Sequence, residues 1–337
     1  MARGLLAFLA APAKNRTRPQ GRRVQTQQSR SCMPRDLVEK STILAPVDFS
    51  TNSRAAALRA CDLGLVSDQR VRLAHALDLP AIAQRKGIAA PLWNELRESE
   101  RREFDALCRD LEHRGASLVP YFEEREPVEM ITELASEKDV GLVVMGTHGY
   151  RGFDRMFLGS VAEKTIRAAV VPVMTVKENE WDAASKIRRI LLATDFSPDS
   201  ENAVTLAMRW ARLLEAGVEV FHAIPATETG PVFAGSVATA GPHVSELRDE
   251  ALRELQSILA RFSEAGVPAG ADLTYGPASI EIVKRVTQYR ANLVVLGRRG
   301  QTRLSTAVFG SVAERVLRQV KCSVLIAPGE LASDATS

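Results

Sequence analysis

The chain has 337 residues, of which 45% are hydrophobic and 25% are charged, as in an ordinary globular protein long enough for two domains. Its 44 basic residues exceed its 41 acidic ones, but eight of the basic residues precede the first acid, Asp36. The remainder is therefore slightly acidic and has no basic surplus to favour nucleic-acid binding. No run of 18 apolar residues is present to cross a membrane.

Residues 1–36 are rich in Arg, Gln, Ser and Pro without helix or strand periodicity, which predicts a disordered basic tail. One alternative is that residues 5–13 are a short export signal. Another is that translation starts at Met33, so that the upstream stretch is a mis-annotated start. A third is that the tail is an arm that contacts nucleic acid or a membrane.

The four cysteines are far apart in the sequence, with no CxxC pair and no Cys/His cluster at zinc spacing. We therefore expect them to be small buried hydrophobic side chains rather than redox or metal-binding groups. A reducing, cytoplasmic location fits this pattern. The four are Cys32, Cys61, Cys108 and Cys322.

The first domain is expected at residues 37–178, where apolar strand patterns alternate with helix patterns. Its first strand ends in Asp48-Phe49-Ser50, where Ser50 or Thr51 can cap the next helix. Five strands and four helices in alternation predict an α/β fold with a doubly wound parallel sheet. The predicted strands lie at 41–50, 71–77, 116–122, 141–145 and 171–176, and the predicted helices at 54–63, 92–113, 127–137 and from 160 onward.

A second domain at residues 188–329 repeats the first, after a polar linker at 179–187 and before a tail at 330–337. The segment ILLATDFSPDS from Ile190 matches ILAPVDFSTNS from Ile43, and VEVFHAI matches VRLAHAL. Corresponding residues are 147 to 151 positions apart, a period that indicates a duplicated domain rather than a solenoid. Its predicted helices include 244–265, 278–289 and one from 311, and its predicted strands include 271–275, 293–296 and 323–327.

The most informative pattern is G-x2-G-x9-G-S, which follows the fourth strand of both domains. Glycines there allow positive φ and a close approach of backbone N–H groups to a ligand, and the first amides of the next helix add the positive end of its dipole. The pattern therefore predicts an anion cradle for phosphate groups. The alternative is that the glycines only form turns. Ser160 and Ser311, each three residues before a Glu, can also form capping boxes with their own helices.

Ligands of open α/β sheets bind outside the carboxyl ends of the strands, where both Asp-Phe-Ser turns and both glycine loops are expected. A charge-assisted hydrogen bond contributes about 1.5–3 kcal/mol, whereas association costs about 4–15 kcal/mol in lost freedom. A few phosphate contacts are therefore insufficient without a buried apolar or aromatic group. A nucleotide such as ATP supplies both parts, which favours it over free phosphate.

With Asp-Phe-Ser after the first strand, His-Ala on the second and G-x2-G-x9-G-S after the fourth, the chain resembles the universal stress protein family. The resemblance covers residues 38–328 and is to the tandem two-domain form of the ATP-binding branch. It implies a protein that binds ATP, AMP or ADP, with Mg²⁺ as the accompanying ion, and acts in stress signalling. It also implies strand order 3-2-1-4-5 in each domain and pairing of the domains about a pseudo-two-fold through their last strands.

The resemblance further implies one nucleotide site in each domain. The aspartates would lie against the adenosine, the alanine after each histidine would line the adenine, and the residue before the first glycine would form the pocket floor. The loop glycines, the serine and the residue after it would hold phosphates and ribose. His148 and Arg299 would be in reach of phosphate, and Arg299 is favoured because its charge does not depend on pH. The expected residues are Pro46, Asp48, Ala76, Met145, Gly146, His148, Gly149, Gly159, Ser160 and Val161 in the first domain, and Asp195, Ala223, Gly276, Leu296, Gly297, Arg299, Gly300, Gly310, Ser311 and Val312 in the second.

One position departs from the family's pattern. The family usually has a glycine before the third helix, which Gly276 provides in the second domain, whereas Arg125 stands there in the first. A side chain at this place would either crowd the ribose or recruit a phosphate. Occupancy of the first site is therefore the less secure expectation.

The chemistry-bearing residues outside the loops favour binding over catalysis. His75 and His222 lie in the middle of strands and are expected to be core histidines that hold a loop, and Asp48 to be a pocket or cap residue rather than a catalytic acid or metal ligand. The GxxxxGK[ST] and GxSxG motifs are absent. We therefore expect no catalytic residues, no metal site and no dedicated enzyme activity.

The resulting hypothesis is a nucleotide-binding regulator of the stress response that acts on an unknown protein partner. The alternatives are a slow ATP hydrolase and a nucleotide-free scaffold for protein interactions. The two domains are expected to pair within the chain, and a homodimer is a further alternative. Neither a membrane nor nucleic acid is expected as a partner, except through the basic tail.

Overall fold

The structure of the chain, a computed structural model, describes residues 41–78, 90–147, 158–177, 186–225, 242–300 and 309–329. The predictions for the tails at 1–36 and 330–337 and for most of the linker lie outside these residues. So do two of the predicted site residues, His148 and Gly149.

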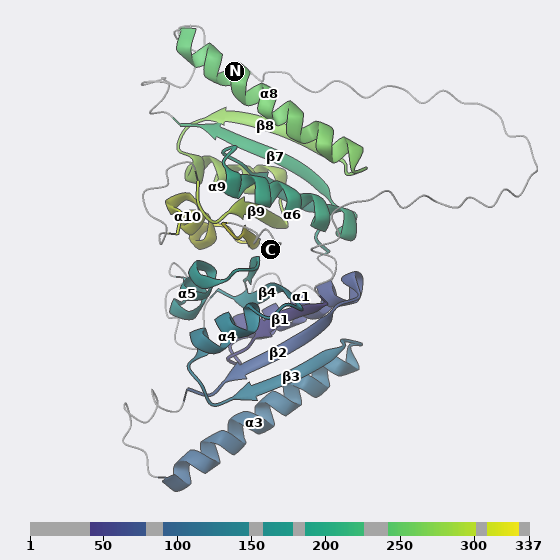
Figure 1. Ribbon diagram of the computed structural model, residues 1–337, viewed down its shortest axis with the longest axis vertical. Coiled ribbons are helices and arrows are strands. Elements are labelled where there is room, and N and C mark those ends of the chain that lie inside the picture. The colour runs from purple at the N-terminus through teal and green to yellow at the C-terminus, as the bar shows by residue number, and fades with distance from the viewer. Residues whose placement is uncertain are drawn as a thin grey trace, which may run out of the picture. The chain divides into compact units, whose positions relative to one another are not determined.

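The N-terminal half alternates strands and helices in the predicted order (Figure 1). Its strands Thr42–Pro46 and Val140–Gly146 are largely apolar and buried, as expected of parallel strands that are covered on both faces. Its elements are β1 (Thr42–Pro46), α1 (Thr51–Ser67), β2 (Arg70–Ala76), α3 (Ala90–His113), β3 (Leu118–Glu123), α4 (Pro127–Ala135), β4 (Val140–Gly146), α5 (Ser160–Ala168) and β5 (Val173–Val176).

The C-terminal half repeats this order element by element. As in the first half, the longest described helix follows the second strand of the unit. Its elements are β6 (Arg189–Ala193), α6 (Pro198–Leu214), β7 (Gly217–Ile224), α8 (Pro242–Glu264), β8 (Ala269–Tyr275), α9 (Ala278–Tyr289), β9 (Leu293–Gly297), α10 (Ser311–Gln319) and β10 (Ser323–Ala327).

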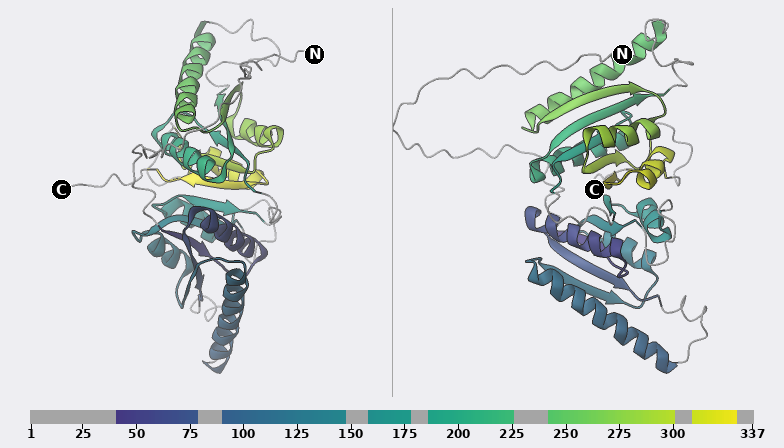
Figure 2. Two further views of the ribbon diagram at one scale, coloured as in Figure 1. Left: turned by 90° about the vertical axis from the view of Figure 1, so that its right-hand side faces the viewer. Right: turned by 180° about the vertical axis from the view of Figure 1, so that it is seen from behind.

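The described strands form one sheet in the order β3-β2-β1-β4-β5-β10-β9-β6-β7-β8 (Figures 1 and 2). The strands within each half pair in parallel. In contrast, β5 and β10 pair antiparallel, with Val173 opposite Ile326 and Thr175 opposite Val324. Each half is thus a doubly wound α/β unit of order 3-2-1-4-5. Antiparallel pairing of two equivalent strands is the arrangement that a two-fold relation between repeats produces.

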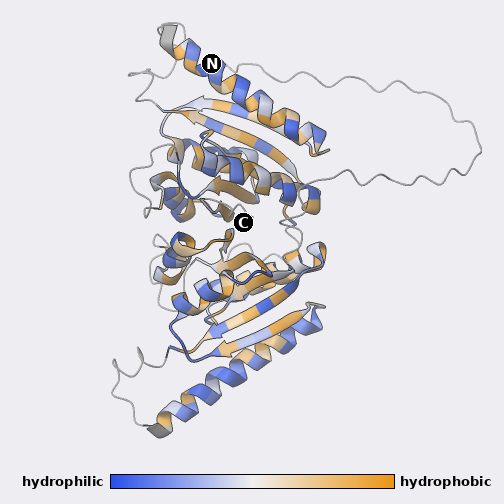
Figure 3. Ribbon diagram, in the orientation of Figure 1, coloured by the Kyte–Doolittle hydropathy of each residue, from blue (hydrophilic) through white to orange (hydrophobic). Residues whose placement is uncertain are grey.

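Two cores cover the two faces of the sheet because successive strand residues point to opposite sides. In β1, Ile43 packs into the core that includes α1, α3, α6 and α8, whereas Leu44 packs into the core that includes α4, α5, α9 and α10. Figure 3 shows the strands as largely hydrophobic and α3 as mixed, in keeping with one buried helix face. The carboxyl ends of the strands lie between these two helical layers.

Several element ends differ from the prediction for local reasons. Ser50 is the N-cap of α1, one of the two caps predicted, and accepts a hydrogen bond from the Ser53 N–H at 3.3 Å, so the helix begins at Thr51 rather than near Arg54. It continues to Ser67 and ends where Asp68 takes a positive φ of 57°. Strand β3 begins two residues later than predicted because Gly115, with φ of 89°, still belongs to the turn that ends α3.

Candidate functional site

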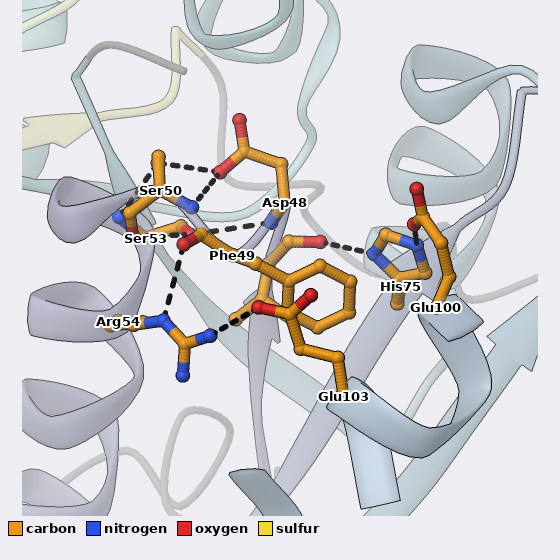
Figure 4. A network of polar contacts seen from close by, with 9 residues as sticks. Asp48, Phe49, Ser50, Ser53, Arg54, His75, Glu100 and Glu103 are labelled. Carbon is orange, nitrogen blue, oxygen red and sulfur yellow. Dashed lines mark hydrogen bonds and ion pairs between the residues drawn. The ribbon is translucent and has the colours of Figure 1, made fainter. Parts of the chain in front are cut away.

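The turn after the first strand of each half is held by its aspartate. Asp48 Oδ1 accepts hydrogen bonds from the Ser50 N–H at 3.2 Å and the Ser50 hydroxyl at 2.6 Å (Figure 4). In the C-terminal half, Asp195 Oδ1 accepts from the Ser197 N–H at 3.1 Å and the Ser200 hydroxyl at 2.5 Å. One oxygen of each carboxylate therefore fixes the turn and orients the rest of the group at the strand end.

The aromatic residue of each turn is held in an unusual backbone conformation. Phe49 and Phe196 both have φ of 62°, a region that costs a bulky residue of the order of 1–3 kcal/mol and persists only where the surroundings impose it. Each ring lies 4.4 Å from the imidazole of the following strand, His75 or His222. His75 Nδ1 lies 2.8 Å from the carbonyl oxygen of Val47 and His222 Nδ1 the same distance from that of Thr194, so both histidines hold the loop as predicted.

The C-terminal half contains a cavity of about 1020 Å³ at the carboxyl ends of β6, β7 and β9. Residues of α8, α9 and α10 complete its walls. Nine of the ten site residues predicted for this half line the cavity: Asp195, Ala223, Leu296, Gly297, Arg299, Gly300, Gly310, Ser311 and Val312. The tenth, Gly276, lies after β8 with φ of 142°.

The first turn of α10 opens into this cavity. Its first helical hydrogen bond runs from the Glu314 N–H to the Gly310 carbonyl at 2.9 Å, so the N–H groups of Ser311, Val312 and Ala313 have no acceptor within the helix. All three residues line the cavity. The site thus presents several amide donors and the positive end of a helix dipole to whatever occupies it.

The capping boxes that Ser160 and Ser311 could have formed are absent. The N-caps of α5 and α10 are Gly159 and Gly310, and neither makes a side-chain capping hydrogen bond, so Ser160 and Ser311 are the first residues inside their helices. The reason is the preceding loop: the Gly159 N–H binds the Thr147 carbonyl at 2.8 Å, and the Gly310 N–H binds the Arg298 carbonyl at 3.0 Å. These bonds fix the glycine at the N-cap.

The loop glycines that the structure describes do not use the positive φ that glycine allows. Positive φ occurs among described glycines at Gly115, Gly266 and Gly276. Gly146 and Gly297 are explained instead by backbone atoms that lie too close for a side chain. A Cβ on Gly146 would lie 2.9 Å from backbone atoms of Asn52 and Ser53, and one on Gly297 would lie 2.8 Å from the carbonyl carbon of Asp199. Both glycines let the N-terminus of a helix, α1 or α6, pack against the end of a strand.

Two arginines follow Gly297 and make different contacts. Arg299, predicted to reach phosphate, lines the cavity and pairs through Nε with the buried carboxylate of Asp199 at 3.3 Å. Arg298 also lines the cavity, but its Nη1 donates to the carbonyls of Arg167 at 3.0 Å and Ala169 at 3.1 Å, at the end of α5. Burial, with the neighbouring charge of Arg299, lowers the pKa of Arg298.

The described site residues of the N-terminal half lie at the same sheet edge. Strand ends supply four of them, the turn after β1 supplies Asp48, and the start of α5 supplies the other three. Arg125, in place of the family's glycine, does not adopt the positive φ of Gly276. It forms ion pairs with Glu133 at 2.5 Å and Glu129 at 4.0 Å, both on α4. The residues at the edge are Pro46, Asp48, Ala76, Met145, Gly146, Gly159, Ser160 and Val161.

Sequence reasoning missed the wall that α8 contributes. Leu247, Glu250, Ala251 and Glu254 of this helix all line the cavity. Their spacing of three and four residues places them on one helix face, but this pattern equally suits a face packed on the sheet. An alignment of the sequences of the two long helices, residue by residue, could have identified these four residues.

Within the described residues, no helix has the length and apolar character needed to cross a membrane. The same part of the chain holds no group of three or more acidic, His or Cys side chains arranged to bind a metal ion. Cys61 and Cys108 are buried free thiols and Cys322 is buried as well, as predicted. Cys32 lies outside the described residues.

Comparison with known proteins gives the chain a family. The sequence model of the universal stress protein family matches residues 40–177 and again 186–328. A universal stress protein of Synechocystis sp. is 33% identical over 147 residues, which cover 41% of this chain and 96% of that protein. One from Mycobacterium tuberculosis is 28% identical over 206 residues, 60% of this chain and 65% of that protein.

A solved structure shows the same fold. The crystal structure of a universal stress protein from Archaeoglobus fulgidus, 19% identical, matches 87% of this chain and 100% of that one with a TM-score of 0.65. The family match repeats once in each half of the sheet. The chain therefore belongs to the universal stress protein family, in the form that carries two copies of the domain.

Proposed function

We propose that the chain binds an adenine nucleotide, ATP or its relatives ADP and AMP, in the C-terminal cavity and acts as a nucleotide-dependent regulator of the stress response. The observation that carries the proposal is the start of α10, whose first three residues line a cavity of about 1020 Å³. Phosphate groups bind at such places because the free amides donate hydrogen bonds and the dipole favours negative charge.

The cavity also has apolar surface that suits a base rather than more phosphate. Ala223, Ile282, Leu296 and Phe309 line it and are apolar. Burial of apolar surface against such a wall stabilises a complex by about 25 cal/mol per Å². A nucleotide therefore gains from the wall the free energy that phosphate contacts alone do not supply.

Asp195 adds a carboxylate to the same cavity. Its Oδ1 is held by Ser197 and Ser200, which fixes the carboxylate, and the residue lines the cavity. A fixed carboxylate accepts hydrogen bonds from ribose hydroxyls without a further loss of side-chain freedom. With ATP, Mg²⁺ would be held mainly by phosphate oxygens and water.

The test is calorimetric titration of the intact chain with ATP, ADP, AMP and adenosine. Ser311→Glu adds a negative charge among the amides of α10, at a helix position where an acid is stabilising. We expect it to weaken ATP binding by at least about tenfold, or about 1.4 kcal/mol, and adenosine binding far less. Gln319→Glu adds the same charge at the exposed far end of α10 and serves as the control. No binding of any of the four ligands would refute the proposal.

A further inference from the structure

We infer that the two halves are unequal and that nucleotide binds in the C-terminal half alone, because Glu100 of α3 fills the corresponding space in the N-terminal half. The inference rests on the proposed function and specifies which half carries it. Its basis is a difference between the long helices α3 and α8 (Figure 1).

Buried side chains fix which residues of these two helices correspond. They recur at the same spacing, as Phe104, Leu107 and Leu111 in α3 and as Leu255, Ile258 and Phe262 in α8. Glu100 therefore corresponds to Ala251, and Glu103 to Glu254. The offset of 151 residues is the one that relates the two glycine loops.

In the N-terminal half, Glu100 fills the space beside His75. Its Oε2 lies 2.7 Å from His75 Nε2, and His75 is only 4% exposed (Figure 4). The rings of Phe49, at 4.4 Å, and Phe122, at 5.3 Å, enclose the imidazole further. Phe196 lies at the same distance of 4.4 Å from His222 in the C-terminal half, so the Glu100 carboxylate is the group that sets the N-terminal half apart at this place.

The second glutamate ties α3 to the rest of the half. Glu103 Oε1 accepts a hydrogen bond from Arg54 Nη2 at 2.6 Å, and Arg54 Nε donates to the Phe49 carbonyl at 3.1 Å (Figure 4). One chain of contacts therefore joins α3, α1 and the turn that bears Asp48. It holds α3 against the strand end.

Neither contact has a counterpart among the described residues of the C-terminal half. Ala251 has no side chain beyond its Cβ, and it lines the cavity together with His222 and Glu254. The position of Arg54 is taken by Glu201, which pairs with Arg261 at 2.9 Å instead of bridging to Glu254. At the place that Glu100 fills in the N-terminal half, the C-terminal half therefore has only the methyl group of Ala251, which lines the cavity.

Residue 251 then determines whether a nucleotide can bind in the C-terminal cavity. A glutamate there would fill space and add negative charge near a polyphosphate. The experiment is equilibrium dialysis of ATP against the intact chain and against Ala251→Glu. We expect one equivalent bound to the unchanged chain and none to Ala251→Glu, with an unchanged circular dichroism spectrum, since the N-terminal half accommodates the same glutamate. Gln256→Glu, which adds the charge at an exposed position of α8, should keep one equivalent.

A substitution in the N-terminal half tests where the nucleotide binds. Glu100→Ala should still bind the one equivalent of ATP that the unchanged chain binds, because Glu100 lies in the half without the nucleotide. Two equivalents bound to the unchanged chain, or one that persists in Ala251→Glu, would overturn the inference and leave the proposed function standing. Loss of the equivalent in Glu100→Ala would place the nucleotide in the N-terminal half and overturn it as well. Absence of binding throughout would refute both.

Discussion

Asp195 and Gly300 lie so close that the carboxylate takes the place a side chain would need: a Cβ on Gly300 would be 2.5 Å from Asp195 Oδ2. The atom in the way belongs to a side chain, so Gly300→Ala can be accommodated if the carboxylate turns. Turning it breaks the hydrogen bonds from Ser197 and Ser200 that orient it. The glycine therefore protects the orientation of the aspartate.

Gly300→Ala is accordingly expected to reduce ATP affinity more than stability. Displacing the carboxylate from the ribose would remove a hydrogen bond to a charged group, which contributes about 1.5–3 kcal/mol, so the dissociation constant should rise by about tenfold or more. Calorimetric titration measures it. Unchanged affinity would show that the orientation of Asp195 does not matter for binding.

Gly297→Ala is expected to act on stability instead. Its Cβ would lie 2.8 Å from the carbonyl carbon and 2.9 Å from the carbonyl oxygen of Asp199, which are backbone atoms that cannot turn aside. Overpacking of this kind costs about 1–3 kcal/mol. Urea denaturation should show that loss, whereas Gly270→Ala, with open space around its Cβ, should change stability by less than about 0.5 kcal/mol. Equal effects of the two substitutions would contradict the packing argument.

Two buried thiols should make the free energy of unfolding depend on pH. Burial raises the pKa of Cys61 to about 12 and that of Cys108 to about 11, from an ordinary value of 9.0. Above pH 9 the unfolded chain releases these protons while the folded chain keeps them, so the free energy of unfolding should fall as pH rises from 9 towards 12. Below pH 9 the contribution is fully present.

The measurement is urea denaturation at pH 8 and pH 10.5 with the unchanged chain and with Cys61→Ala/Cys108→Ala. The double variant lacks both thiols, so its stability should fall less between the two pH values. Rapid reaction of Cys61 with a thiol reagent in the folded chain at pH 8 would also oppose this account, because a thiol with a raised pKa holds little thiolate there.

Arg298 joins the glycine loop of one half to a helix of the other, and we expect this contact to stabilise the fold. It donates to two carbonyls at the end of α5, where a cation also complements the helix dipole. Arg298→Ala should lower the free energy of unfolding by about 1.5–3 kcal/mol, as for hydrogen bonds to a charged group. Arg167→Ala removes an exposed ion pair with Glu163 and should cost about 0.3–0.5 kcal/mol. The contact is unimportant if denaturation midpoints of the two variants coincide.

The fold was accessible from the sequence because its signals are local and occur twice. Apolar runs such as that ending at Asp48 and its repeat ending at Asp195 recur with the same spacing to the next helix. A parallel sheet in two equivalent halves follows from that repetition. Helix and strand ends were less accurate, since positive φ at residues such as Asp68 and Gly115 decides them.

The physical reasons for individual site residues were less accessible because they depend on tertiary contacts. The spacing of Gly297 suggested backbone freedom, but its requirement is the nearby backbone of Asp199, far away in sequence. The position of Ser311 suggested a cap, but the bond from the Gly310 N–H to the loop moves the cap by one residue. Ala251 carried no signal by itself, and its meaning comes from the contact that Glu100 makes at the equivalent place.

The most direct test of the central claim is amide hydrogen exchange at the start of α10, with and without ATP. Ser311, Val312 and Ala313 have no helical acceptors and should exchange fast in the free protein. If their N–H groups bind phosphate, a peptide covering 309–314 should become protected when ATP is added, while the equivalent peptide 158–163 stays unchanged. Binding of ATP with no protection at 309–314 would contradict the account.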